Sequence, residues 1–183
     1  MTELLITEPS QRRDLALFAD RLLRLDPGAV VRLRVRADGM VAAWAKTPFD
    51  MLACLVLRAE LSPPDVTCGA RELGSGQTGP PMDFAWRWGL PPENGFVHVD
   101  DVPAAVLMSL QESQTLEVTD GSTTVTVPTQ CAQTLSALGF LPDPLPPQEV
   151  VRVRATSAWL RVDARFGSVF ARQALPGQIA LLG

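Results

Sequence analysis

The residues best suited to acid–base chemistry in this sequence are its single histidine and an aspartate two positions later. Residues 96–103 alternate in polarity like a β-strand, so His98 and Asp100 are expected on one face. Such a pair could move a proton or bind a metal ion, but a metal site needs more ligands and there is no second histidine. Asp101 is better explained as the N-cap of a helix over residues 103–113. We therefore predict no catalytic residue, metal ion or cofactor here.

Aromatic and arginine side chains provide a second set of ligand-binding candidates. Trp86 and Trp88 alternate with Arg87 beside a proline-rich stretch, which suits an interface arm, a ligand wall or packing onto the parent domain. Arg154 is predicted to lie opposite Trp159 in a hairpin, a pairing suited to cation–π contact. The residues that together form the predicted ligand site are His98, Asp100, Trp86, Trp88, Arg154 and Trp159.

The cysteines and the glycine-rich segment give no further chemical motif. Cys54, Cys68 and Cys131 are odd in number and scattered, which argues against a disulfide framework and for a reducing cytoplasm. Cys68 could be a nucleophile only beside a base, and the sequence identifies none, so a buried thiol is expected. Residues 74–81 have no lysine and lack the spacing of a phosphate-binding loop, and we interpret them as a linker.

Two arginine-bearing stretches that read alike position these residues. Residues 30–36 alternate apolar residues with arginine, as in a half-buried strand, and Asp38-Gly39 suits a tight turn. A two-residue turn pairs Leu33 with Trp44 and turns Ala42 and Trp44 toward the core, leaving the arginines on the other face. In the second stretch, residues 150–162, a turn at Thr156-Ser157 places apolar pairs on the core face, with Val151 and Val153 facing Leu160 and Val162.

The remaining segments predict both helices and strands. Residues 7–25 form a helix whose apolar stripe includes Phe18 but not Leu17. Residues 51–61 predict a central strand and residues 66–73 an edge strand. Further along the chain the sequence predicts a hairpin over 115–127 with Leu116 opposite Val125 and Val118 opposite Thr123, a helix over 128–138, a strand over 166–172 and an apolar tail over 179–182.

These elements predict an α+β protein with a mostly antiparallel sheet and helices packed on one side. We expect an N-terminal unit at residues 1–73, a linker or arm at 74–95 and a C-terminal unit at 96–183, and a single joint domain stays open. A duplicated helix-plus-hairpin unit explains the two arginine stretches, but chance similarity is the alternative. The predicted placement of Trp44 on the apolar face and Trp159 on the arginine face breaks the symmetry.

The composition excludes some classes of protein. With 183 residues, 46% hydrophobic and 20% charged, the chain is typical of a soluble globular protein. No apolar run could span a bilayer, and the first residues lack a signal-peptide pattern. No lysine or arginine lies between Trp88 and Val151, whereas eight acids do. Since the whole chain carries −4, the rest is net positive by four, and opposite-sign surfaces could join two subunits or face each other within one fold.

Three phrases of the sequence resemble a family of uncharacterised actinobacterial proteins. They are residues 45–50 (AKTPFD), residues 88–92 (WGLPP) with 101–104 (DVPA), and residues 159–167 (WLRVDARFG). The resemblance covers most of the chain and implies no known activity, so no residue role is carried over.

Three functions compete. The first is a non-catalytic cytoplasmic protein that acts through self-association or a protein partner, which the absence of a catalytic constellation favours. The second is a small-ligand-binding protein or enzyme with its pocket near His98, Asp100, Trp86 and Trp88. The third is a winged-helix-like DNA binder, which we rank last because its recognition helix, residues 128–138, has no arginine or lysine.

Overall fold

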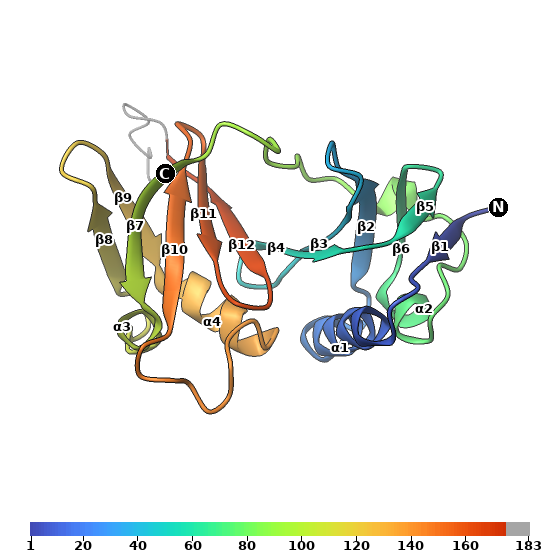
Figure 1. Cartoon of the computed structure of the whole chain (residues 1–183), viewed down its shortest axis with the longest axis horizontal. Helices are drawn as coiled ribbons and strands as arrows, with labels where there is room; N and C mark the ends of the chain where they lie inside the picture. The colour runs from blue at the N-terminus through green and yellow to red at the C-terminus, as the bar shows by residue number, and fades with distance from the viewer. Residues whose placement is uncertain (175–183) are drawn as a thin grey trace, which may run out of the picture.

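The structure is a computed structural model and describes residues 1–174. Its main feature is one eight-stranded antiparallel sheet with helices along one face (Figure 1). The strands are, in spatial order, β6 (Asp65–Gly69), β2 (Val30–Val35), β3 (Val41–Lys46), β4 (Leu52–Leu57), β12 (Ser168–Arg172), β11 (Trp159–Asp163), β10 (Val150–Ala155) and β7 (Val97–Pro103). This confirms the predicted α+β class with a mostly antiparallel sheet.

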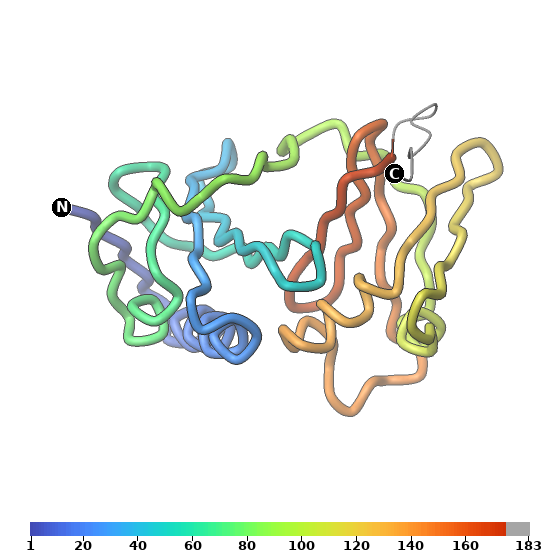
Figure 2. The backbone as a smooth tube through the Cα atoms, turned by 180° about the vertical axis from the view of Figure 1, so that it is seen from behind, coloured from blue at the N-terminus to red at the C-terminus, as the bar shows by residue number. Residues whose placement is uncertain are grey.

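The helices and two small sheets complete the fold, and Figure 2 shows the small sheets at opposite ends of the molecule. The helices are α1 (Pro9–Leu25), α2 (Ala70–Gly74), α3 (Ala104–Met108) and α4 (Thr129–Ala137), with a 3-10 turn at Asp83–Ala85. The small sheets pair β1 (Glu3–Leu5) with β5 (Glu60–Ser62), and β8 (Thr115–Thr119) with β9 (Thr124–Pro128). Within residues 1–174, the helices are too short or too polar to cross a membrane.

From either edge toward its centre, the large sheet has one edge strand followed by three strands that are consecutive in the chain. In each half a helix precedes a three-stranded meander, α1 with β2–β3–β4 and α4 with β10–β11–β12. The halves meet where β4 pairs antiparallel with β12, and β6 and β7 form the two edges. This arrangement is compatible with the duplicated helix-plus-hairpin unit. The proposed division at residues 73 and 95 stays a prediction.

Both arginine stretches are two-faced strands. Val31 and Leu33 of β2 and Val151 and Val153 of β10 are buried in the core that the helices cover. The arginines between them point to the opposite face of the sheet, which we call the outer face. Burying this apolar side is the dominant stabilisation of such a sheet, because each fully buried valine or leucine contributes about 1.5–3 kcal/mol.

The first arginine hairpin has a three-residue loop, not the predicted two-residue turn at Asp38-Gly39. Arg36 N donates to Met40 O at 2.8 Å, and Gly39 N donates to Arg36 O at 2.9 Å. Gly39 has a φ of +81°, which glycine adopts without steric cost. Three-residue hairpin loops commonly use such a residue. The pairing is therefore shifted by one position.

This shift moves alternate side chains of β3 to the other face of the sheet. Arg32 pairs with Trp44, so the prediction that Ala42 and Trp44 face the main core is wrong. The predicted break in symmetry is wrong as well, because Trp44 and Trp159 lie in one cluster on the outer face. The buried members of this outer cluster are Ala42, Trp44, Leu52, Cys54, Trp159 and Phe170.

The other two hairpins differ from the predicted register by two residues. In β10–β11, Thr156 N donates to Trp159 O and Arg154 pairs with Arg161, so the predicted pairing of Arg154 with Trp159 is wrong. A two-residue shift leaves the faces unchanged, and the predicted core side is correct. In β8–β9, Leu116 pairs with Val127 and Val118 with Val125, because Asp120 closes a longer loop by accepting hydrogen bonds from Ser122 N and Thr123 N.

The remaining corrections concern where strands and helices begin and end. The predicted edge strand over residues 66–73 stops at Gly69 and continues as α2. The helix predicted over residues 103–113 is the short α3, and its N-cap is Pro103 rather than Asp101. The predicted helices over 7–25 and 128–138 match α1 and α4 within two residues. The apolar tail predicted at 179–182 lies outside the described residues.

Candidate functional site

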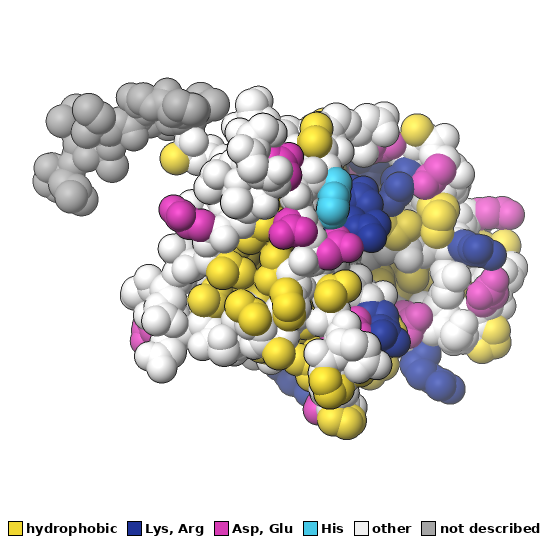
Figure 3. All heavy atoms as spheres, turned by 60° about the vertical axis from the view of Figure 1, so that its left-hand side comes forward, with side chains coloured by type: hydrophobic (Ala, Val, Ile, Leu, Met, Phe, Trp, Pro, Cys, Tyr) yellow, Lys and Arg dark blue, Asp and Glu magenta, His cyan; other side chains and the backbone are white. Residues whose placement is uncertain are grey.

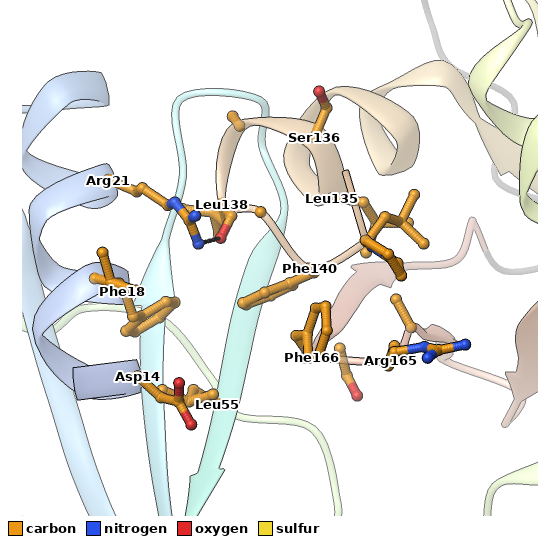
Figure 4. Close-up of a pocket in the computed structure, with 18 of the residues that line it drawn as sticks. Asp14, Phe18, Arg21, Leu55, Leu135, Ser136, Leu138, Phe140, Arg165 and Phe166 are labelled. Carbon is orange, nitrogen blue, oxygen red and sulfur yellow. Dashed lines mark hydrogen bonds between the residues drawn. The ribbon is translucent and has the colours of Figure 1, made fainter. Parts of the chain in front are cut away.

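A large groove lies between α1 and α4 on the helix side of the sheet (Figure 4). It has a volume of about 1120 Å³. The α1 side contributes Phe18, and Leu55 of β4 lies behind it. The opposite wall comes from the end of α4 and the β11–β12 turn, with Phe140 and Phe166. The groove therefore follows the junction between the two halves of the molecule.

Aromatic rings form the apolar surface of the groove. Phe18 and Phe140 stack across the junction with ring centroids 5.9 Å apart and an interplanar angle of 13°. Gly167 lets the Phe140 ring approach the backbone, since a Cβ at that position would lie 2.5 Å from the ring. Leu17 and Phe166 also line the groove but are 42% and 52% exposed. These two are large apolar side chains that a bound molecule could bury.

Arg21 connects the two sides of the groove. Its Nη1 donates to the carbonyl of Leu138 at 2.9 Å, one of the last carbonyls of α4, as the dashed line in Figure 4 shows. Gly139 follows with a φ of +64°, and a side chain there would collide with the Arg21 guanidinium. The arginine thus caps the C-terminal end of α4, where positive charge is favourable.

The arginines that line the groove are engaged with partners within the fold. Arg165 binds Glu149 through two nitrogens, with Nε 3.1 Å from Oε1. This hydrogen-bonded pairing raises the pKa of Arg165. Arg24 on the rim pairs with Asp20 at 2.6 Å. A trough that combines exposed apolar side chains with charged groups suits the binding of a polypeptide segment.

The residues of the predicted ligand site do not line one common cavity. Trp88 and Trp159 line a smaller cavity of about 450 Å³, where Arg172 lies over the Trp159 ring at 4.4 Å. Trp86 packs edge-on against Trp88 with centroids 5.5 Å apart, and Arg32 lies 6.0 Å from the Trp86 ring. A ligand role for these residues stays a prediction.

His98 and Asp100 do not share a strand face, which corrects the predicted pair. A bulge in the β7–β10 pairing separates them, and His98 Nε2 lies 2.9 Å from Asp101 Oδ1 instead. Asp101 also accepts from Arg152, and these hydrogen bonds, the one from Arg152 foremost, lower its pKa. Arg154 belongs to a different ion pair, 3.4 Å from Asp163. Residues 1–174 contain no cluster of His, Cys, Asp and Glu suited to a metal ion.

Figure 3 shows the histidine beside basic and acidic side chains at the β7 end of the sheet, with a hydrophobic patch nearby. Exposed apolar side chains at this end are Val97, Val106 and Val150. The β7 edge itself carries the bulge, two aspartates and Pro103, which are features that protect an edge strand against pairing. We therefore do not expect strand addition at β7.

The acidic window between Trp88 and Val151 is partly balanced within the fold. Asp101 pairs with Arg152, and Glu149 pairs with Arg165, so two acids of the window bind basic residues that follow it. This supports the alternative in which the opposite charges face each other within one fold. Glu112, Glu117 and Asp120 remain exposed on and before the β8–β9 hairpin.

None of the three thiols is set up as a nucleophile. Cys54, Cys68 and Cys131 are buried and free, and burial raises the pKa of each thiol to about 12. At pH 8 only about one thiol in 10⁴ is then ionised, and the thiolate is the reactive form. We expect iodoacetamide to label the native protein at least about 100-fold more slowly than the urea-unfolded protein. Rapid labelling of one cysteine in the native state would contradict this, with mass spectrometry as the readout.

Two family models match separate parts of the chain. Residues 1–88 match the family described as "Domain of unknown function (DUF8010)", and residues 109–176 match "Domain of unknown function (DUF8185)". Neither description carries a known activity, and both matches are similarities of parts of the chain. The DUF8010 match contains α1 and the first arginine hairpin, whereas the DUF8185 match contains α4 and the second. None of the curated proteins matches the sequence. The actinobacterial origin implied by the resemblance stays a prediction.

Solved structures similar to this chain include several DNA polymerase sliding clamps. The clamp from Caulobacter crescentus has a TM-score of 0.56 at 12% identity, covering 100% of this chain and 69% of the clamp. The clamp from Bacillus subtilis gives 0.53 at 13%, covering 100% and 68%, and that from Pseudomonas aeruginosa gives 0.56 at 13%, covering 98% and 66%. The chain is thus similar in fold to these clamps and spans about two thirds of their length.

The sequence alone did not identify the groove. Leu17 gave the one available signal, a large apolar residue off the buried stripe of its helix. The sequence around Phe140 and Phe166 gave no such signal, because only the fold determines which residues lie beside them in space.

Proposed function

We propose that this protein is a non-catalytic scaffold that acts by binding another polypeptide along the groove between α1 and α4. The observation that carries the proposal is the groove itself, with Leu17 and Phe166 exposed beside the buried Phe18–Phe140 stack. Large exposed apolar side chains in a hollow with a charged rim are typical of protein-binding surfaces. A second copy of this chain is the first partner to test.

The likeness to proteins named DNA polymerase sliding clamps supports a scaffold rather than an enzyme, but it is a likeness of fold. A cytoplasmic location is part of the proposal, and three free cysteines support it. Nucleic acid stays an unlikely partner in our interpretation. Neither α3 nor α4 carries a charged residue with which it could bind phosphate groups.

Sedimentation of the purified protein tests self-association. We expect the Leu17→Asp/Phe166→Asp variant to weaken any association of the wild type at least tenfold, because each carboxylate would have to be desolvated in the contact. The matched control is Val106→Asp/Phe84→Asp, which alters residues that are 44% and 75% exposed away from the groove. Equal weakening by both variants would show that the groove is not the contact.

A further inference from the structure

We propose that the smaller cavity, lined by Trp88 and Trp159, binds a small anion that carries a flat aromatic ring. Its volume of about 450 Å³ is within the range of about 300–1,000 Å³ that pockets for small ligands have. It shares no lining residue with the groove between α1 and α4, so it is a second binding surface. Both halves of the large sheet contribute to it, Lys46 from β3 and Arg172 from β12.

Two indole rings provide the surface on which a flat ligand ring would stack. Trp159 is buried, whereas Trp88 is 40% exposed in the cavity. The position of Trp88 is fixed by its neighbour, because Trp86 Nε1 donates to Trp88 O at 2.6 Å and the two rings meet edge-on. Leu52 and Phe170 complete the apolar wall. An aromatic ligand could therefore cover an exposed indole that is already held in place.

The charged side chains of the cavity favour a negative ligand. They are Lys46, Asp50 and Arg172, so the lining carries one more positive than negative charge. The Arg172 guanidinium lies over the Trp159 ring at 4.4 Å, a contact that uses its face and leaves the N–H donors at its edge. None of the ion pairs within residues 1–174 includes Arg172. Carboxylate and phosphate groups accept paired hydrogen bonds from such an edge, whereas a cation would be repelled.

Lys46 is the second donor for an anion. Its side chain is only 21% exposed, but its partner Asp50 is 95% exposed. An ion pair with so exposed a partner contributes little to stability. The ammonium group also has three N–H donors, so it can bind a ligand anion in place of Asp50 or together with it.

The aromatic and the charged parts of the site are adjacent. Gly89 directly follows Trp88, and a Cβ at position 89 would lie only 3.1 Å from Arg172 Nη2. The absence of a side chain at Gly89 thus lets the guanidinium approach the segment that carries the exposed indole. A single small molecule with a ring and an acidic group can contact both Trp88 and Arg172.

Calorimetric titration of the full-length protein with four matched compounds tests the ligand class. The aromatic anions are 2-naphthoate and 2-naphthyl phosphate, which distinguish a carboxylate from a phosphate ligand. The controls are uncharged 2-naphthamide and decahydro-2-naphthoate, an anion without an aromatic ring. We expect at least one aromatic anion to bind at least tenfold more tightly than either control. If neither aromatic anion binds at about 1 mM, or if a control binds equally well, the proposal is wrong.

Variants locate the bound anion. Arg172→Gln and Trp88→Ala should each weaken its binding at least tenfold. The matched controls are Arg58→Gln and Phe84→Ala, which change exposed residues outside the cavity and should bind like the wild type. Losses in Arg172→Gln and Trp88→Ala no larger than in these controls would place the anion elsewhere and overturn the proposal.

The indole N–H signals in NMR spectra give a readout on the unaltered protein, independent of how any cavity variant folds. Titration with the aromatic anion should shift the signals of Trp88 and Trp159, which Trp88→Phe and Trp159→Phe assign. Binding of the anion with both signals unmoved would contradict the proposed site.

Discussion

Replacing Phe140 with alanine is expected to lower the free energy of unfolding by about 3–5 kcal/mol, the usual cost of a buried phenylalanine. The ring is buried and stacks on Phe18 across the junction of the two halves. Because Gly167 lies directly against it, the backbone there could fill the space only by moving the β11–β12 turn. Urea unfolding followed by circular dichroism measures the effect.

The matched control is Phe166→Ala in the same groove. Phe166 is half exposed, so its loss should cost no more than about 1 kcal/mol. Similar losses for the two variants would mean that the Phe18–Phe140 stack does not hold the halves together. A change in the denaturant m-value with Phe140→Ala would instead indicate that the halves no longer unfold as one unit.

Replacing Arg165 with alanine is expected to lower the free energy of unfolding by more than breaking an exposed surface ion pair does. The Glu149 side chain is only 6% exposed, and Arg165 supplies its two charge-assisted hydrogen bonds. Removing one partner of a buried ion pair leaves a charge without compensation, which typically costs about 3–5 kcal/mol. Arg165 is half exposed, so water can reach the site and the loss should be smaller than for a fully buried pair. Chemical unfolding of the purified variant gives the number.

Two further variants separate this pair from an ordinary surface pair. The Glu149→Leu/Arg165→Met double variant removes both charges, and its stability should lie within about 1 kcal/mol of the wild type. Arg24→Ala breaks the exposed pair with Asp20 and should cost at most about 0.5 kcal/mol. If Arg165→Ala lowers the free energy of unfolding no more than Arg24→Ala does, the burial of Glu149 has no energetic consequence.

The strands and helices follow from local patterns, and this is why most of them could be predicted. Alternation of valine and arginine is a property of a few adjacent residues, and it correctly identified β2 and β10 and their buried faces. The pairing register of the strands was harder to predict. One extra loop residue at Gly39 was enough to move Trp44 to the outer face, and the sequence Asp-Gly suits turns of two lengths.

The groove could not be predicted because it is made by contacts between distant parts of the chain. Phe18 and Phe140 are 122 positions apart in the sequence, and they meet only because β4 pairs with β12. The His98–Asp100 pair failed for a related reason. Its face depended on an unbroken strand, and the bulge opposite Val153 and Arg154 arises from pairing with a strand some fifty residues later.

Photo-cross-linking from position 17 tests the central claim most directly. A benzoylphenylalanine residue would replace Leu17 in one protein and Val106 in another, since the two side chains are 42% and 44% exposed on helices and only Leu17 lines the groove. In cells that produce the protein, we predict a discrete cross-linked polypeptide from position 17, which a second copy of the chain would also give, and none from position 106. No adduct from position 17, or the same adducts from both positions, would contradict a binding function for the groove.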